Sequence, residues 1–308
     1  PRHRGGSRPA SESAMSPPRW RGRPRPGCLA LVAAASVGSF PAAAAPASDG
    51  AVDSDVLAEG RRASATASIR GWAAHGRLDK VEDLLKQRAD ILASNDHGST
   101  ALSGAATKGH AAVVSLLLKH NAEADADDLN GLRPIHWAAL HGHAPIVGLL
   151  LEAGAAAGEP SDELRQQPLH LAARAGSVAS MEALLAAGAP ADDPDAERCT
   201  PLLWAAFGGR AEAAELLLRR RAAADAQDQA GNTALHWAAR GHLETVQVLL
   251  AYGAQPNVED AEGRTAAFWA EHEGRGDILA LLGPSTEASA AAGSRRRASQ
   301  PWVVDVEL

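Results

Sequence analysis

A repeat of about 33 residues is the feature that most constrains how this chain can fold. A four-residue block, one variable residue and a pair of small residues, usually Ala-Ala, recur along most of the sequence. The blocks begin at residues 68, 100, 133, 167, 200, 233 and 265, so the steps are 32, 33, 34, 33, 33 and 32 residues. Chance does not produce seven copies at this spacing. The period indicates a repeat protein in which each unit packs on its neighbours.

Each copy has the pattern of two short helices. Threonine before proline, as in Thr200-Pro201, suits a helix start, because the hydroxyl caps free N–H groups and proline lacks a donor that would have no partner. The Ala-Ala pair allows close approach to a neighbouring helix. A leucine cluster such as Leu149–Leu151 gives the second helix its apolar face. Helices shorter than about 12 residues are marginal alone, so the units must be stabilised by stacking.

The blocks Thr200-Pro201-Leu202-Leu203 and Thr233-Ala234-Leu235-His236 resemble the T-P-L-H-x-A signature of the ankyrin repeat family. The resemblance covers roughly residues 62–283, about seven units, and we place the repeat domain at 63–283. It implies an all-α fold class, an ankyrin-repeat solenoid of stacked helix-turn-helix units with β-hairpin loops. It also implies the family's usual role, the binding of protein partners by the concave groove and hairpin tips.

Two copies depart from the family pattern at the turn of the hairpin. The family's turn glycine is present at Gly98, Gly131 and Gly231, but Arg165 and Arg198 replace it in the fourth and fifth units. A non-glycine residue in the left-handed conformation costs about 1 kcal/mol or more. We therefore expect these two hairpins to adopt a different turn.

The segment 1–47 has the pattern of a signal or transit peptide. A basic stretch precedes the 13-residue apolar run Cys28–Phe40, which Ala42–Ala45 follow as an A-x-A-like stop. Thirteen helical residues reach only about 20 Å, which is too short for a bilayer core of roughly 30 Å. The alternative is a disordered tail. The first interpretation places the protein in the secretory route or an imported organelle, and the second places it in the cytoplasm.

The remaining flanking segments have the composition of a linker and a tail. Residues 48–62 are interpreted as the linker, and residues 284–308 are expected to form a disordered C-terminal tail. Within that tail, Arg296-Arg297-Ala298-Ser299 resembles the site of a basophilic kinase, which makes Ser299 a candidate for phosphorylation.

Composition argues against several classes of function. The net charge is -7; residues 1–48 contain seven arginines and one acid, or +6, which leaves -13 on residues 49–308. An acidic body does not favour nonspecific nucleic-acid binding. The only two cysteines, Cys28 and Cys199, exclude a framework of several disulfides. We find no phosphate-binding loop, nucleophile elbow or zinc-ligand spacing, so we predict no cofactor, no metal and no enzymatic activity.

Tryptophan occupies one position of the repeat. The residue after each block is, in order, Trp72, Gly104, Trp137, Leu171, Trp204, Trp237 and Trp269. Rings in this position can pack between adjacent units, or their edges can reach the concave groove. In the second interpretation the groove accepts an extended or proline-rich peptide, with Trp137, Trp204 and Trp237 as anchors.

Apolar residues at the tips and helix ends are the other candidates for partner binding. Leu129, Leu132 and Leu140 stand where solvent-facing residues are expected, and His141 and Phe207 end first helices. These residues favour units three to five as the contact region, although they can also pad adjacent hairpins. Binding residues are common on loops held by a rigid frame.

Three classes of function follow from the sequence. The first is a non-catalytic interaction scaffold or adaptor that acts as a monomer and binds a protein partner. The second is the substrate-recruiting or targeting portion of an enzyme whose catalytic part lies elsewhere. The third is a structural spacer without a specific partner.

Overall fold

A computed structural model describes residues 69–161 and 164–283 of the chain. The segments 1–47, 48–62 and 284–308, together with Ser299, lie outside these residues. Among the described residues, no helix is both long and apolar enough to cross a membrane.

The helices come in pairs, one pair for each repeat. Residues 69–74 are helical and are followed by α2 (Leu78–Lys86). The later pairs are α3 (Ala101–Lys108) with α4 (Ala111–Lys119), α5 (Pro134–Leu140) with α6 (Ala144–Glu152), α7 (Pro168–Ala175) with α8 (Val178–Ala186), α9 (Pro201–Phe207) with α10 (Ala211–Arg219), α11 (Ala234–Ala238) with α12 (Leu243–Ala251), and α13 (Ala266–His272) with α14 (Gly276–Leu282).

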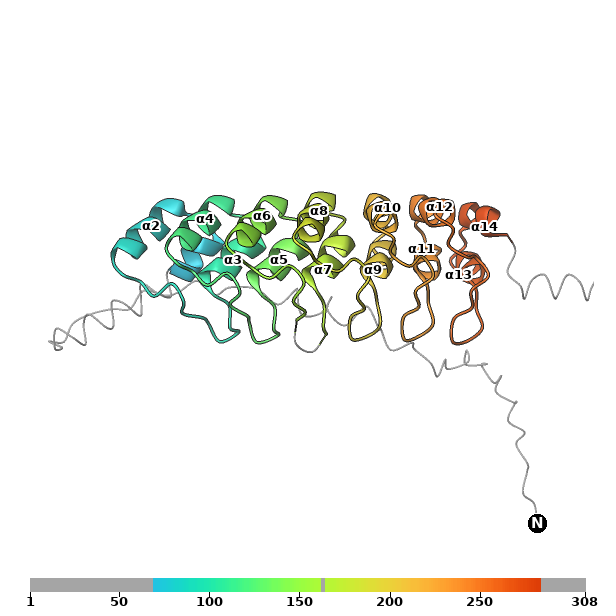
Figure 1. Ribbon diagram of the computed structural model, residues 1–308, viewed down its shortest axis with the longest axis horizontal. Helices are drawn as coiled ribbons and strands as arrows, with labels where there is room; N and C mark the ends of the chain where they lie inside the picture. The colour runs from blue at the N-terminus through green and yellow to red at the C-terminus, as the bar shows by residue number, and fades with distance from the viewer. Residues whose placement is uncertain (1–68, 162–163, 284–308) are drawn as a thin grey trace, which may run out of the picture.

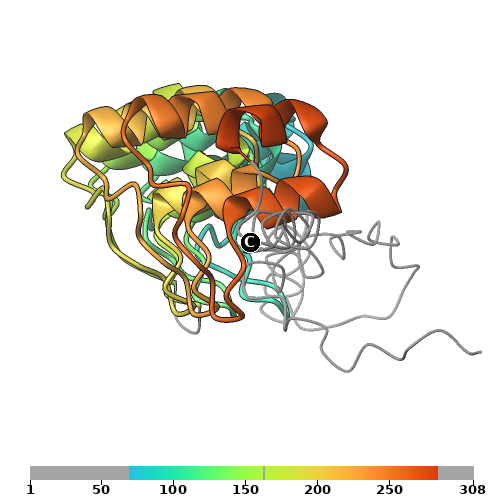
Figure 2. The ribbon, with the colours of Figure 1, turned by 90° about the vertical axis from the view of Figure 1, so that its right-hand side faces the viewer.

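The pairs stack into two parallel rows, as the repeat predicts (Figure 1). The first helix of each pair, which we call the inner helix, contacts the inner helices of the neighbouring repeats, and the second or outer helices form the other row. Long loops extend to one side of the inner row. Seen from the C-terminal end, the loops of successive repeats overlie one another (Figure 2). The prediction of an all-α solenoid is confirmed.

The core lies between the two rows. Each Ala-Ala pair of the central units is fully buried on an inner helix, for example Ala138 and Ala139 on α5. The outer helices contribute larger side chains such as Ile146 and Leu150 on α6. Small residues on one helix opposite branched residues on the next allow close packing, which is why short helices persist here.

Helix starts follow the prediction in part. The Thr100 hydroxyl accepts a hydrogen bond from the Ser103 N–H at 3.2 Å, so it caps α3. Proline is the first residue of α5, α7 and α9. The expectation that Thr200 caps its helix is wrong, because its buried hydroxyl oxygen has no hydrogen-bond partner among the described residues.

The loop tips are tight turns, and the described residues contain no β-strand. In the fifth unit, the Asp195 N–H donates to the Cys199 carbonyl at 3.0 Å, and the Asp195 carboxylate accepts from the N–H of Glu197 and of Cys199. The prediction that Arg165 and Arg198 produce a different turn is wrong. Their φ angles of 49° and 62° are left-handed, like those of the glycines in the other tips.

Hydrogen bonds between neighbouring tips account for this result. The Ala196 N–H donates to the Leu164 carbonyl, and the Gln229 N–H donates to the Glu197 carbonyl, both at 3.0 Å. Each accepting carbonyl directly precedes one of the two arginines. These contacts outweigh a backbone cost of about 1 kcal/mol, together with the Asp195 carboxylate in one turn and the Ser161 hydroxyl, which accepts the Gln166 N–H, in the other.

Candidate functional site

An aspartate in the tip holds the tryptophan of the inner helix that follows it. The indole Nε1–H of Trp204 donates to Asp195 at 3.0 Å, and that of Trp237 donates to Asp228 at 3.1 Å. Trp137 and Trp269 make the same contact with Asp128 and Asp260, at 3.0 and 3.4 Å. One carboxylate oxygen of each aspartate accepts two turn N–H groups, and the other accepts the indole. Each carboxylate therefore ties its tip to its helix.

The second unit, which has no tryptophan at this position, supports this interpretation. Gly104 occupies the tryptophan position there, and the tip residue is Asn95 instead of aspartate. The Asn95 side-chain oxygen still accepts the N–H of His97 and of Ser99. The turn therefore needs one oxygen, and the second carboxylate oxygen is present in the four units where it binds an indole.

Ring and guanidinium groups form a continuous row across α7, α9, α11 and α13. We call it the aromatic–arginine row. Arg174 lies over Trp204 at 5.6 Å, Phe207 meets the edges of Trp204 and Trp237 at 6.1 and 5.4 Å, and Arg240 lies over Trp237 and Trp269 at 4.5 and 4.0 Å. Its members are Arg174, Trp204, Phe207, Trp237, Arg240, Trp269 and, 5.9 Å from Trp269, His272.

The row contains both covered and accessible groups. Trp204 is 1% exposed and Trp237 is 9% exposed, whereas Arg174, Phe207, Arg240 and Trp269 are half-buried. Arg174, Phe207 and Arg240 share one position of the repeat; they cover the Trp204 and Trp237 rings and provide solvent-facing surface. Burial lowers the pKa of the Arg240 guanidinium from its usual value, because the charged form loses hydration.

Two of the residues predicted to bind the partner, Trp204 and Leu132, are inaccessible. The expectation that an edge of Trp204 reaches the groove is wrong, because Phe207 and Arg174 cover the ring and Asp195 takes its N–H group. The expectation that Leu132 faces solvent is also wrong: it is 4% exposed and belongs to the core. Trp237 is nearly covered in the same way as Trp204.

A second accessible group lies in the third unit. Trp137 is half-buried on α5 and stacks with the exposed His141 at 6.3 Å, which in turn stacks with His143 at 6.0 Å. Leu140 is half-buried beside them, and Leu129 at the loop tip is 75% exposed. The structure thus places four predicted residues of this unit where solvent reaches them.

The signature histidines connect consecutive units inside the core. His136 accepts the Arg133 N–H at Nδ1 and therefore donates from Nε2 to the Gln166 carbonyl of the next unit, at 3.1 Å. His170 and His236 repeat this arrangement. Desolvation lowers the pKa of His136 to about 4. These histidines are structural. No three His, Cys, Asp or Glu groups of the described residues gather as a metal site.

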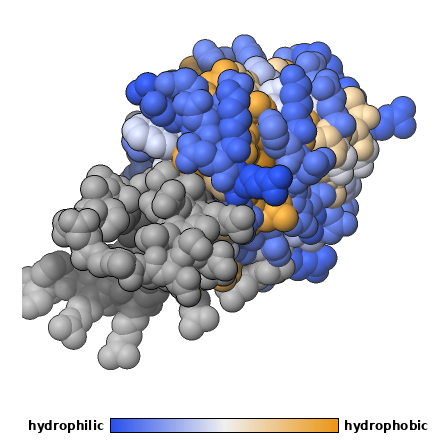
Figure 3. All heavy atoms as spheres, turned by 90° about the vertical axis from the view of Figure 1, so that its left-hand side faces the viewer, coloured by the Kyte–Doolittle hydropathy of each residue, from blue (hydrophilic) through white to orange (hydrophobic). Residues whose placement is uncertain are grey.

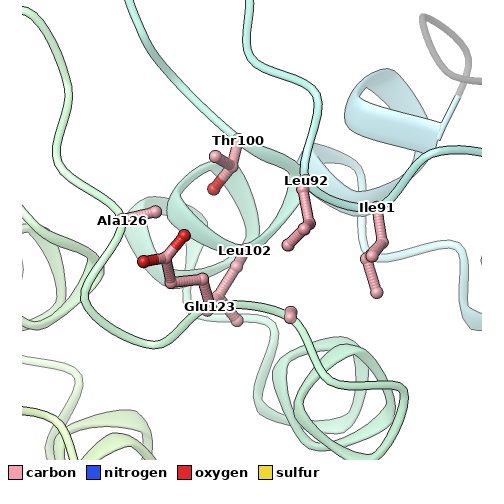
Figure 4. Close-up of a pocket in the computed structure, with 7 residues that line it drawn as sticks. Ile91, Leu92, Thr100, Leu102, Glu123 and Ala126 are labelled. Atoms are coloured by element: carbon pink, nitrogen blue, oxygen red, sulfur yellow. The ribbon is translucent and has the colours of Figure 1, made fainter.

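The N-terminal end has different surface features. A small depression lies between the first and second units, lined by residues that include Leu92, Thr100 and Glu123 (Figure 4). It is far smaller than a typical ligand pocket. Apolar patches are visible among polar ones at this end (Figure 3), and Leu78 and Leu92 of the first unit are exposed.

The stacked pairs, connecting histidines and buried alanines define a helical repeat protein. The family model for ankyrin repeats matches the chain in three copies, at residues 71–159, 156–228 and 212–290. The chain belongs to the ankyrin repeat family. Ankyrin repeats generally mediate protein–protein interactions and are typically non-catalytic.

A solved structure extends the comparison. The crystal structure of the human ASB11 ankyrin repeat domain is 30% identical in sequence, with a TM-score of 0.63. The match covers 70% of this chain and 98% of that chain. Comparison with curated protein sequences gives no match.

Proposed function

We propose that this chain is a non-catalytic scaffold that binds a protein partner through the accessible side of its inner helices. The observation that carries this proposal is the aromatic–arginine row, which runs without interruption from Arg174 to His272. Tryptophan, tyrosine and arginine dominate the energetics of protein interfaces. Here the tryptophans are fixed by the tip aspartates, so the groups that cover them have little freedom to lose on binding.

The third unit extends the proposed contact surface beyond this row. Trp137, Leu140 and His141 lie on the same side of an inner helix as the corresponding residues of later units, and Leu129 projects from the tip. An exposed leucine at 75% accessibility has apolar area to bury against a partner. At about 25 cal/mol per Å², covering such a side chain contributes on the order of 1–2 kcal/mol.

A photo-crosslinking experiment in cells tests this surface. p-Benzoylphenylalanine is placed at Phe207 or at Trp137 in the full chain, and, as the matched aromatic control, at the exposed Tyr252 at the end of outer helix α12. We expect discrete adducts from the first two positions and none in common with position 252. Because we propose that the chain acts as a monomer, these adducts should not have the mass of two joined copies.

Two results would contradict the proposal. Identical adducts from position 252 and from the inner-helix positions would show that contacts are not confined to the proposed surface. A lack of adducts at Phe207 and Trp137 while position 252 reacts would place the partner on the outer helices instead.

A further inference from the structure

Arg240 stacks on two tryptophan rings and has no hydrogen-bonded partner among the described residues. Its Cζ lies 4.5 Å from the Trp237 ring centre and 4.0 Å from that of Trp269. Its Nε atom is buried without an acceptor in this part of the chain. A guanidinium stacks through its faces and donates hydrogen bonds in its own plane. Because the rings use the stacking contacts and Nε is buried, a ligand must approach the donors of the two terminal nitrogens in that plane.

Arg264 shows what the completed arrangement looks like. Its guanidinium also lies over Trp269, at 4.4 Å, and its Nε donates to the Asp260 carboxylate at 2.8 Å. Arg240 has the stacking half of this arrangement without the carboxylate. The same chain thus contains a stacked arginine with its in-plane acceptor and a second stacked arginine lacking one.

The carboxylates near Arg240 are already engaged elsewhere. Asp228, Asp260 and Glu273 attract its charge, but none is hydrogen-bonded to it among the described residues. Asp228 accepts the Trp237 indole and two turn N–H groups. Asp260 binds Arg264, and Glu273 lies 3.4 Å from His272. None of these contacts supplies Arg240 with an acceptor, so its accessible donors remain available to a group from another molecule.

We infer that Arg240 binds the carboxylate of an aspartate or glutamate in an extended segment of the protein partner. This inference rests on the function proposed above and names the chemistry of the segment that the surface takes. A carboxylate matches the in-plane fork of a guanidinium with two parallel hydrogen bonds, and these charge-assisted bonds are stronger than neutral ones. Binding would also provide the partly desolvated cation with its counter-ion.

The repeat spacing sets the pattern of the bound segment. Phe207 occupies the same position of the repeat as Arg240, one unit earlier. Neighbouring helices pack about 8–10 Å apart, so the two side chains are separated by roughly 10 Å. An extended chain advances about 3.3 Å per residue. The segment should therefore have an acidic residue at Arg240 and an apolar residue roughly three positions away, at Phe207.

Selection from a display library of random peptides of about 16 residues tests this pattern on the full-length chain. An extended peptide of this length reaches about 50 Å, which is longer than the proposed contact. We expect the enriched peptides to share an acidic residue and an apolar residue at this spacing. In an enriched peptide made synthetically, replacing the acidic residue that faces Arg240 by its amide should weaken binding roughly tenfold to a hundredfold. The affinity should also fall as salt is added.

Protein variants identify the arginine that is responsible. Arg240→Gln should weaken the enriched peptide to the same extent, and should erase most of the difference between the acidic peptide and its amide form. Arg219→Gln is the matched control, because Arg219 is an exposed arginine on outer helix α10. Its substitution should leave peptide affinity unchanged. The thermal midpoint of each variant checks that the fold is retained. The comparison of the acidic peptide with its amide form uses the wild-type chain alone, so it does not depend on the folding of any variant.

The results separate this inference from the broader proposal. The carboxylate site would be overturned if the enriched peptides lack acidic residues, or if they bind wild type and Arg240→Gln equally well. The interaction surface would still stand in that case if Phe207→Ala abolishes peptide binding. Peptides unaffected by either Arg240→Gln or Phe207→Ala would refute both. A library that yields no enrichment would overturn the inference as well.

Discussion

The contact between Asp195 and Trp204 should be a measurable source of stability in the fifth unit. Trp204 is 1% exposed and Asp195 is 6% exposed, and the indole N–H lies 3.0 Å from the carboxylate. Trp204→Phe removes a hydrogen bond to a charged group, worth about 1.5–3 kcal/mol. The smaller ring also leaves roughly 40 Å³ unfilled, which adds about 1 kcal/mol at ~24 cal/mol per Å³. The free energy of unfolding should therefore fall by about 2.5–4 kcal/mol.

A second substitution isolates the hydrogen bond from the cavity. Asp195→Asn keeps the oxygen that accepts the N–H groups of Glu197 and Cys199, as Asn95 does in its own turn. It also turns an amide donor toward the Trp204 N–H, which should cost about 1–3 kcal/mol. Combined with Trp204→Phe, the same change removes a buried carboxylate that has lost its donor, so it should be neutral or stabilising.

The double-mutant cycle is measured by urea unfolding of the full chain, followed by circular dichroism and fitted with nearest-neighbour coupling between units. We expect a coupling free energy of about 1.5–3 kcal/mol between the two sites. Trp137→Phe, at a half-buried ring, is the control and should cost less. If the two substitutions are additive within about 0.5 kcal/mol, the contact does not stabilise the tip and this reasoning is refuted.

Other outcomes concern the turn, the core histidine and the tip acids. Arg198→Gly should raise the free energy of unfolding by about 0.5–1 kcal/mol in urea titrations, because φ is 62° there; a decrease would contradict the strain argument. Burial lowers the pKa of His136 to about 4, below its ordinary value of 6.5, so the unfolded state binds its proton first. Stability should therefore fall as the pH is lowered from about 6.5 to about 4, and unchanged urea midpoints across that window would be inconsistent with this. Burial, then Asp195 and Asp228, raise the pKa of Glu197 to about 6, and Asp195→Asn should lower it in an NMR titration.

The repeat made the fold predictable, because one recurring pattern specifies helix pairs, their order and their core. The Ala138-Ala139 pair is buried as its size requires. The error at Arg198 has a clear physical origin. Backbone strain at one residue was weighed alone, whereas the turn is stabilised by the Asp195 carboxylate and by a hydrogen bond to the next tip. The bond between tips joins different units, and the carboxylate contact joins different residues of one turn, so an argument about one residue at a time omits both.

The candidate site was predictable in position and only partly in exposure. The common slot of the tryptophans placed them correctly along the inner helices, but did not show that Trp204 is covered by Phe207 and Arg174. The signal that could have revealed this was present in the sequence, since aspartate stands nine residues before each of four tryptophans and Asn95 stands before Gly104. The sequence does not show that Arg240 lacks an acceptor, because this depends on where the neighbouring carboxylates point.

The nine-residue interval between tip aspartate and tryptophan also restricts how an array of this kind can change length during evolution. A duplication or deletion with its breakpoint inside that interval would create hybrid units, such as one with asparagine ahead of an indole or an acid ahead of glycine. Breakpoints elsewhere in the unit would transmit both partners together. Gain and loss of units should therefore be tolerated best when crossovers fall within the outer helices, where no such pair is divided.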